Sequence, residues 1–180
     1  MDMMVDEPRS SFLPLLRQER LGVQEVKDLC GGLDGREELV QLADCVLAAD
    51  NRVARNAAWV LTHCRDEAVA CLQEYMDRLI DRAMQTDNSS LRRLVLHLLE
   101  RFDYEADGLR TDFLDFCLEH MQRMGEPSGV QSLCMKIALK LCRLYPELEG
   151  ELMYILQNME MTYYQPGVKS LRNRILRHAL

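Results

Sequence analysis

A helical pattern that recurs about every 38 residues constrains the fold of this chain more than any other feature of its sequence. Counted from Val53, apolar residues fall at offsets 0, 3, 4, 7, 8 and 11, which form one stripe along an α-helix. The same offsets recur from Leu91, Val130 and Val168, and 22 of the 24 positions are apolar. The exceptions are Asn56 and Arg172. Four copies of one helical pattern predict a repeat architecture.

A second set of helical stretches lies between these copies, at about 36–49, 66–85, 107–124 and 146–161. Turn residues precede the repeated helices, and the Asp, Asn and Ser side chains at 50–51 and 87–90 can cap their first free N–H groups. Each unit is therefore expected to consist of a helix A, a turn and a helix B. We expect four such units, at about 36–64, 66–102, 104–142 and 146–180, with their apolar faces buried by stacking.

The composition agrees with an all-α fold. The 180 residues suit one domain, only 9 are Gly and 5 are Pro, and aromatic residues make up 6%. Leu, Met, Ala, Glu and Arg, which favour helices, fill much of the rest. The sequence predicts an α-α superhelix, or solenoid, of about four helical hairpins.

Two segments resemble the HEAT and armadillo-like families of helical repeats. Residues 50–61, DNRVARNAAWVL, follow the HEAT pattern of an Asp-containing turn, then Val and Arg, then an Ala-rich helix B, and residues 87–99 follow it less closely. The later two copies keep the apolar spacing and lose the Asp turn. The resemblance covers about residues 36–180 and implies a fold rather than a function.

The two ends are expected to differ from the repeats. Residues 12–29 are predicted to form one or two helices of a degenerate N-terminal cap within residues 1–35, and residues 1–10 are predicted to be loose. In the last copy Arg172 and Asn173 replace apolar residues. A terminal repeat has no following neighbour, so a polar face there is typical of a C-terminal cap.

Charge is divided between the two kinds of helix. The net charge is −7, yet the four B segments (51–64, 89–102, 128–143 and 166–180) together carry +11, which leaves −18 for the rest. Offsets 2, 6 and 10 of helix B lie on one stripe, since residues four apart are neighbours on a helix. No acid occupies these positions, and the candidate partner-binding residues on them are Arg55, Trp59, His63, Arg93, His97, Arg101, Lys136, Lys140, Arg174 and His178.

Two interpretations of this stripe remain open. In solenoids of the HEAT type the B helices line the concave face, so the resemblance implies a basic surface for an acidic peptide, an acidic protein or a phosphate backbone. Alternatively, the cations are solvated or pair with acids of neighbouring A helices. Trp59, the only Trp, is either an interface anchor or part of the helix packing.

No sequence feature indicates catalysis, a cofactor or a metal site. The chain has no Gly-rich phosphate loop, no HExxH and no GxSxG motif. His63 and Cys64 are predicted to point in different directions, which disfavours a shared metal. We therefore predict a non-catalytic scaffold that binds a protein or peptide. The alternative is a nucleic-acid-binding protein that resembles, in architecture alone, some alkylpurine DNA glycosylases built of HEAT-like repeats.

The sequence also predicts a compartment. Residues 1–10 are acidic and lack the apolar core of a signal peptide, and no apolar run is long enough to span a membrane. The seven cysteines form no CxxC pair and mostly occupy apolar helix positions. Reduced thiols of this kind are typical of a cytoplasmic protein, and a monomer is compatible with all of these features.

Overall fold

The computed structural model describes residues 12–33 and 35–178, and all regular secondary structure in this part of the chain is helical. The all-α fold expected from the repeat is therefore confirmed. No helix in these two ranges combines the length and apolar character that crossing a membrane requires. Residues 1–10, predicted to be loose, lie outside the described residues. The chain divides between Phe102 and Asp103 into two compact units.

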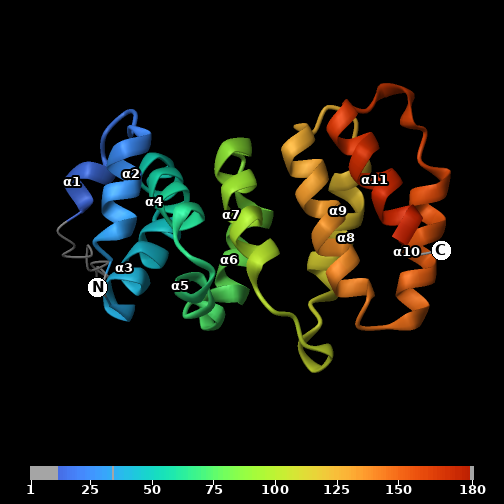
Figure 1. Ribbon diagram of the computed structural model, residues 1–180, viewed down its shortest axis with the longest axis horizontal. Coiled ribbons are helices and arrows are strands. Elements are labelled where there is room, and N and C mark those ends of the chain that lie inside the picture. Colours follow the sequence, from blue (N-terminus) through green and yellow to red (C-terminus); the bar gives the residue numbers. More distant parts are fainter. Residues whose placement is uncertain (1–11, 34, 179–180) are drawn as a thin grey trace, which may run out of the picture. The chain divides into compact units, whose positions relative to one another are not determined.

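The first unit contains two stacked hairpins and a small N-terminal cap (Figure 1). Helix α3 packs against α4, α6 packs against α7, and the two B helices α4 and α7 pack against each other. The cap helices α1 and α2 both contact α4. The elements are α1 (Leu13–Leu16), α2 (Val23–Gly31), α3 (Arg36–Val46), α4 (Asn51–His63), α5 (Asp66–Ala70), the 3-10 turn η1 (Gln73–Tyr75), α6 (Met76–Gln85) and α7 (Ser89–Arg101).

The second unit repeats the same arrangement. Helix α8 packs against α9, α10 packs against α11, and the B helices α9 and α11 contact each other (Figure 1). The elements are η2 (Ala106–Gly108), α8 (Thr111–Gln122), α9 (Ser128–Cys142), α10 (Pro146–Asn158), η3 (Met161–Tyr163) and α11 (Pro166–His178).

The B helices begin where the sequence predicts. The Asp50 carboxylate accepts hydrogen bonds from the backbone N–H groups of Arg52 and Val53, and the Asn88 side chain accepts one from Leu91. Each cap satisfies N–H groups that have no partner inside the helix. Helix α9 instead follows Pro127 without a side-chain cap.

Two of the A helices differ from the prediction. The stretch 66–85 is not one helix but α5, a 3-10 turn and α6. The buried residues Val69, Leu72 and Tyr75 recur every three positions, which matches the three residues per turn of a 3-10 helix. The stretch expected from 107 begins as α8 only at Thr111, after a separate 3-10 turn.

The apolar stripes of the B helices form the core, and both exceptions to the pattern have a structural reason. Asn56 is buried, and its side-chain amide donates to the carbonyls of Leu16 and Gln18 at 2.8 and 2.9 Å. Arg172 donates to the carbonyls of Leu156 and Gln157 at 2.7 and 3.0 Å, so it caps the end of α10. Each polar side chain satisfies backbone groups that an apolar residue would leave without partners.

Candidate partner-binding surface

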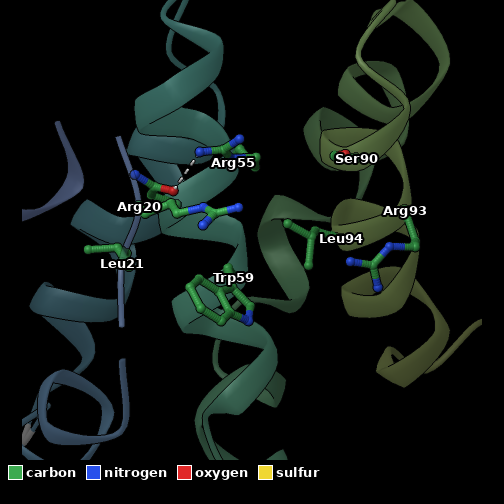
Figure 2. Close-up of a pocket in the computed structure, with 8 residues that line it drawn as sticks. Arg20, Leu21, Arg55, Trp59, Ser90, Arg93 and Leu94 are labelled. Carbon is green, nitrogen blue, oxygen red and sulfur yellow. Dashed lines mark hydrogen bonds between the residues drawn. The ribbon is translucent and has the colours of Figure 1, made fainter. Parts of the chain in front are cut away.

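A pocket of about 310 Å³ lies on the first unit, where the residues before α2 meet the B helices α4 and α7 (Figure 2). Its cationic lining residues are Arg20, Arg55 and Arg93, which come from three different segments. The other described lining residues are apolar or neutral, and none of them carries a carboxylate: Leu21, Asn56, Trp59, Ser90 and Leu94. The pocket therefore combines three positive charges with an indole and two leucines.

The pocket depends on the attachment of the N-terminal cap to α4. Asn56 holds the segment that follows α1 through the carbonyls of Leu16 and Gln18. Its neighbour Arg55 donates to the carbonyl of Glu19 at 3.1 Å. These contacts place Arg20 and Leu21 beside α4, so the buried polar residue in the core stripe also builds one wall of the pocket.

No acid in the described part of the chain neutralises the arginines of the pocket. Within residues 12–33 and 35–178, neither Arg20 nor Arg93 forms a hydrogen bond or an ion pair, and both are exposed. Arg55 is half-buried and bonds to the carbonyl of Glu19 and the side-chain oxygen of Asn56. For these three residues the structure therefore offers no compensating carboxylate.

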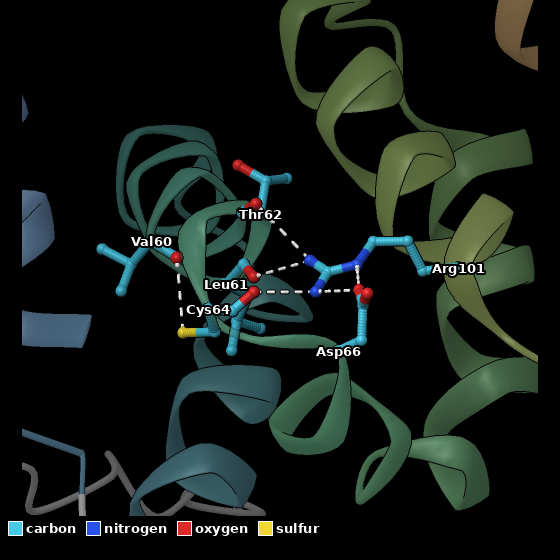
Figure 3. Close-up of polar contacts among 6 residues, drawn as sticks. All are labelled: Val60, Leu61, Thr62, Cys64, Asp66 and Arg101. Atoms are coloured by element: carbon cyan, nitrogen blue, oxygen red, sulfur yellow. Dashed lines mark hydrogen bonds and ion pairs between the residues drawn. The ribbon is translucent and has the colours of Figure 1, made fainter. Parts of the chain in front are cut away.

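Arg101 has a different environment, although it lies on the same stripe of α7 as Arg93. Its guanidinium group donates to the carbonyl of Cys64 at 2.7 Å and to those of Leu61 and Thr62 at 3.4 Å (Figure 3). It also pairs with Asp66 at 2.6 Å, and its side chain is only 14% exposed. Arg101 thus caps the last carbonyls of α4 and joins α4 to α7. These intramolecular bonds occupy the guanidinium group.

The tryptophan and the histidines of the B-helix stripe also differ in their surroundings. Trp59 is half-buried and lines the pocket. His63 is exposed, lies edge-on to the Trp59 ring with centroids 5.8 Å apart, and its Nδ1 is 2.9 Å from the Trp59 carbonyl. His63 lines a second pocket, together with Cys30 and Cys64. His97 is half-buried on α7 and is not part of the lining of the first pocket.

The four remaining candidates belong to the second unit. Lys136 and Lys140 lie on α9 and are half-buried, whereas Arg174 and His178 lie on α11 and are exposed. Arg174 forms no ion pair with a carboxylate of the described chain. Helices α9 and α11 contact each other, so the four residues lie on neighbouring B helices of this unit.

Sequence periodicity alone does not find the whole pocket. Arg20 and Leu21 lie in the irregular segment between α1 and α2, outside any repeat. The only available signal is the polar Asn56 in an otherwise apolar stripe, since a buried amide needs partners from another segment. No group of three or more His, Cys, Asp or Glu side chains in the described ranges is arranged to hold a metal ion.

Paired A and B helices, stacked through their B helices in each unit, define a helical-repeat protein. The sequence model described as the HEAT repeat domain matches residues 16–179, which is most of the chain. The chain therefore belongs to the HEAT-repeat family. Membership of this family points to a scaffold or interaction role, since HEAT repeats commonly mediate protein interactions. Neither a curated protein nor a solved structure matches the chain significantly.

Proposed function

We propose that this HEAT-repeat protein is a non-catalytic interaction module that binds an acidic segment of a partner protein through its B helices. The pocket between the cap, α4 and α7 is the centre of the proposed surface. The observation that carries the proposal is the set of three arginines around Trp59 with no carboxylate among the lining residues that the structure describes.

The lining defines the chemistry of the partner. A guanidinium group binds a carboxylate through two parallel N–H donors, and arginine is enriched at interfaces for this reason. Trp59, Leu21 and Leu94 offer apolar contact area between the charges. A peptide in which acidic residues flank an apolar side chain fits both features. The apolar side chain enters the pocket of about 310 Å³, and the acids contact its arginine rim.

The contacts that the pocket arginines make, or do not make, in the free protein favour ligand binding. Arg20 and Arg93 are exposed and have no intramolecular partner among the described residues, so a ligand does not have to break an existing ion pair to reach them. Arg55 is already held by Glu19, which fixes its position before a ligand arrives. Preorganisation of this kind lowers the entropic cost of binding. Arg101, which caps α4, is not part of the proposed contact set.

The other candidates are proposed as secondary contacts. Lys136, Lys140, Arg174 and His178 give the second unit its own basic B-helix residues, and His63 and His97 extend the stripe on the first. The seven cysteines are free thiols, which supports a reducing compartment such as the cytoplasm as the place of action.

A phosphate backbone is the competing ligand. Three arginines and an indole also suit a phosphate and a base. The chain as a whole carries −7, however, and the residues outside the B segments carry −18. A long polyanion extends beyond the pocket and is repelled by those residues, whereas a short acidic peptide contacts the pocket alone. We therefore favour the peptide, and duplex DNA is the comparison in the test.

The test measures fluorescence anisotropy of a labelled peptide that alternates glutamate and leucine, with labelled duplex DNA in parallel. We expect saturable peptide binding that weakens as salt rises from about 50 to about 200 mM. Arg93→Glu and Arg55→Glu should each weaken it about tenfold or more, or about 1.4 kcal/mol.

Arg52→Glu is the matched control, because it makes the same charge change in the same helix α4 outside the pocket. It should change the affinity less than about threefold. Equal losses in all three variants would show that net charge, not the pocket, governs binding. Tighter binding of the DNA than of the peptide would contradict the proposed partner.

A further inference from the structure

The thiols of Cys30 and Cys64 come from different helices and share one hydrogen-bond acceptor. Cys30 lies in α2, and Cys64 follows the last residue of α4. Both donate to the carbonyl of Val60, at 3.3 and 3.5 Å. Burial raises the pKa of the Cys64 thiol, and the neighbouring Cys30 side chain raises it further. The two thiols therefore converge on one carbonyl oxygen at the contact between the cap and the first repeat.

This thiol pair is open to solvent on one side. Cys30 is half-buried, Cys64 is 8% exposed, and both line a pocket of about 460 Å³. Lys27, His63 and Arg65 supply its basic groups, and none of the described lining residues carries a carboxylate. A small anionic molecule can therefore reach the pair with a favourable electrostatic interaction.

The second unit contains another pair of cysteines, which can be compared with Cys30 and Cys64. Cys117 and Cys134 also interact with each other, yet both are fully buried. Burial is the main cause of the raised pKa of the Cys117 thiol. Both pairs consist of two cysteine thiols, but the two pairs differ in access to solvent. Access is one of the factors that control the rate of thiol–disulfide exchange.

We propose that Cys30 and Cys64 form a reversible redox pair, which a small anionic disulfide such as glutathione disulfide oxidises to an intramolecular disulfide. Cys30 loses its proton to solvent, and its thiolate attacks one sulfur of the small disulfide. The S–S bond of the small disulfide breaks, a mixed disulfide forms on Cys30, and the released thiolate takes up a proton from solvent. The Cys64 sulfur then attacks the Cys30 sulfur and displaces the second small thiolate, which takes up the proton of Cys64. Two protein thiols and one small disulfide give one protein disulfide and two small thiols.

The geometry assigns the order of these steps. Cys30 is the more accessible thiol and reacts first. Cys64 is more buried, and its raised pKa makes it less reactive towards a dissolved disulfide, so it acts second, on the mixed disulfide that Cys30 holds near it. The product links α2 covalently to the end of α4 and closes the loop from residue 30 to residue 64, which restricts the unfolded chain. The basic pocket around Trp59 is separate, so this proposal does not depend on the proposed function.

The test incubates the folded, reduced protein with glutathione disulfide, alkylates the free thiols and maps the tryptic peptides without reduction. Trypsin places Cys30, Cys64, Cys71, Cys117 and Cys134 in separate peptides. We expect a Cys30–Cys64 linked peptide, an intact mass lower by two hydrogens, and a higher urea midpoint that glutathione reverses. Cys117 and Cys134 should remain thiols until the protein is denatured.

Variants separate the two steps. Cys64→Ala should stop at a mixed disulfide on Cys30, and Cys30→Ala should leave Cys64 reduced. Cys71→Ala is the matched control, because Cys71 is an exposed thiol outside the pair, and the Cys30–Cys64 link should form as in the parent. A mixed disulfide that persists on Cys30 in the unmodified chain would overturn the proposal. Oxidation of Cys117–Cys134 at the same rate, or no reaction at Cys30, would also overturn it.

Discussion

The side-chain amide of Asn56 donates a hydrogen bond to the backbone carbonyl of Leu16, which lies 40 residues earlier, at 2.8 Å. A second bond joins Asn56 to the carbonyl of Gln18 at 2.9 Å. One buried polar residue in an apolar stripe therefore attaches the N-terminal cap to the first repeat. Because the segment that it holds carries Arg20 and Leu21, the stability of the first unit and the shape of the basic pocket are coupled.

The first prediction concerns this attachment. Asn56→Ala removes both donors and leaves two carbonyls without their partner, which should lower the free energy of unfolding by about 1–3 kcal/mol. Urea unfolding measures the loss. The acidic peptide should also bind more weakly, because the wall that contains Arg20 is released. Asn158→Ala is the control, since Asn158 is exposed and its amide bonds only to Tyr154 of its own helix. A control effect as large as that of Asn56→Ala would contradict the assigned role.

The second prediction concerns Arg101. Arg101→Ala should lower the free energy of unfolding by about 1–3 kcal/mol, because the carbonyls at the end of α4 lose their donors. Asp66→Asn should cost less than about 1 kcal/mol, because the Asp66 side chain is 86% exposed and exposed ion pairs contribute little. Urea unfolding of both variants separates the two contributions.

Arg177→Ala provides the comparison for Arg101. Arg177 is exposed on α11 and, among residues 12–33 and 35–178, bonds only to the carbonyl of Asn173 in the same helix. Its removal should change the free energy of unfolding by less than about 0.5 kcal/mol. If Arg101→Ala destabilised the protein no more than Arg177→Ala does, the capping role of Arg101 would be refuted.

The third prediction concerns alkaline pH. Burial first, and then the charges of Glu151 and Glu149, raise the pKa of the Cys142 thiol from 9.0 to about 11. The folded state therefore favours the protonated thiol. Its contribution to stability is complete below pH 9 and is lost as the pH rises towards about 11. The free energy of unfolding should fall across this window, and it should fall less in Cys142→Ala. An identical slope in the two proteins would refute the assignment.

The repeat itself was predictable from the sequence because it depends on local periodicity. The stripes that begin at Val53 and Leu91 require only that one helix face be apolar, and the caps Asp50 and Asn88 act within a few residues of their own position. Such interactions are encoded in neighbouring residues. The HEAT-like architecture therefore follows from the sequence, and the structure confirms it.

The pocket was only partly predictable, because its contacts are distant in sequence. Arg93 and Arg101 occupy equivalent positions on one stripe of α7, yet Arg93 is exposed and Arg101 caps α4. The difference arises because the end of α4 lies beside Arg101 only in the folded chain. Arg20 lies in an irregular segment, and no periodicity brings it to Arg55. Tertiary contacts of this kind leave no pattern in a single helix.

Trp59 is the only Trp of the chain, so its fluorescence reports directly on the pocket that it lines. The most direct test of the proposed binding site is a titration of the folded protein with the unlabelled glutamate–leucine peptide while the Trp59 emission is followed. We expect a saturable change whose midpoint agrees with the anisotropy measurement and which Arg93→Glu shifts about tenfold or more. Peptide binding that leaves the Trp59 emission unchanged, or that is unaffected by Arg93→Glu, would contradict the assignment of this pocket as the partner-binding site.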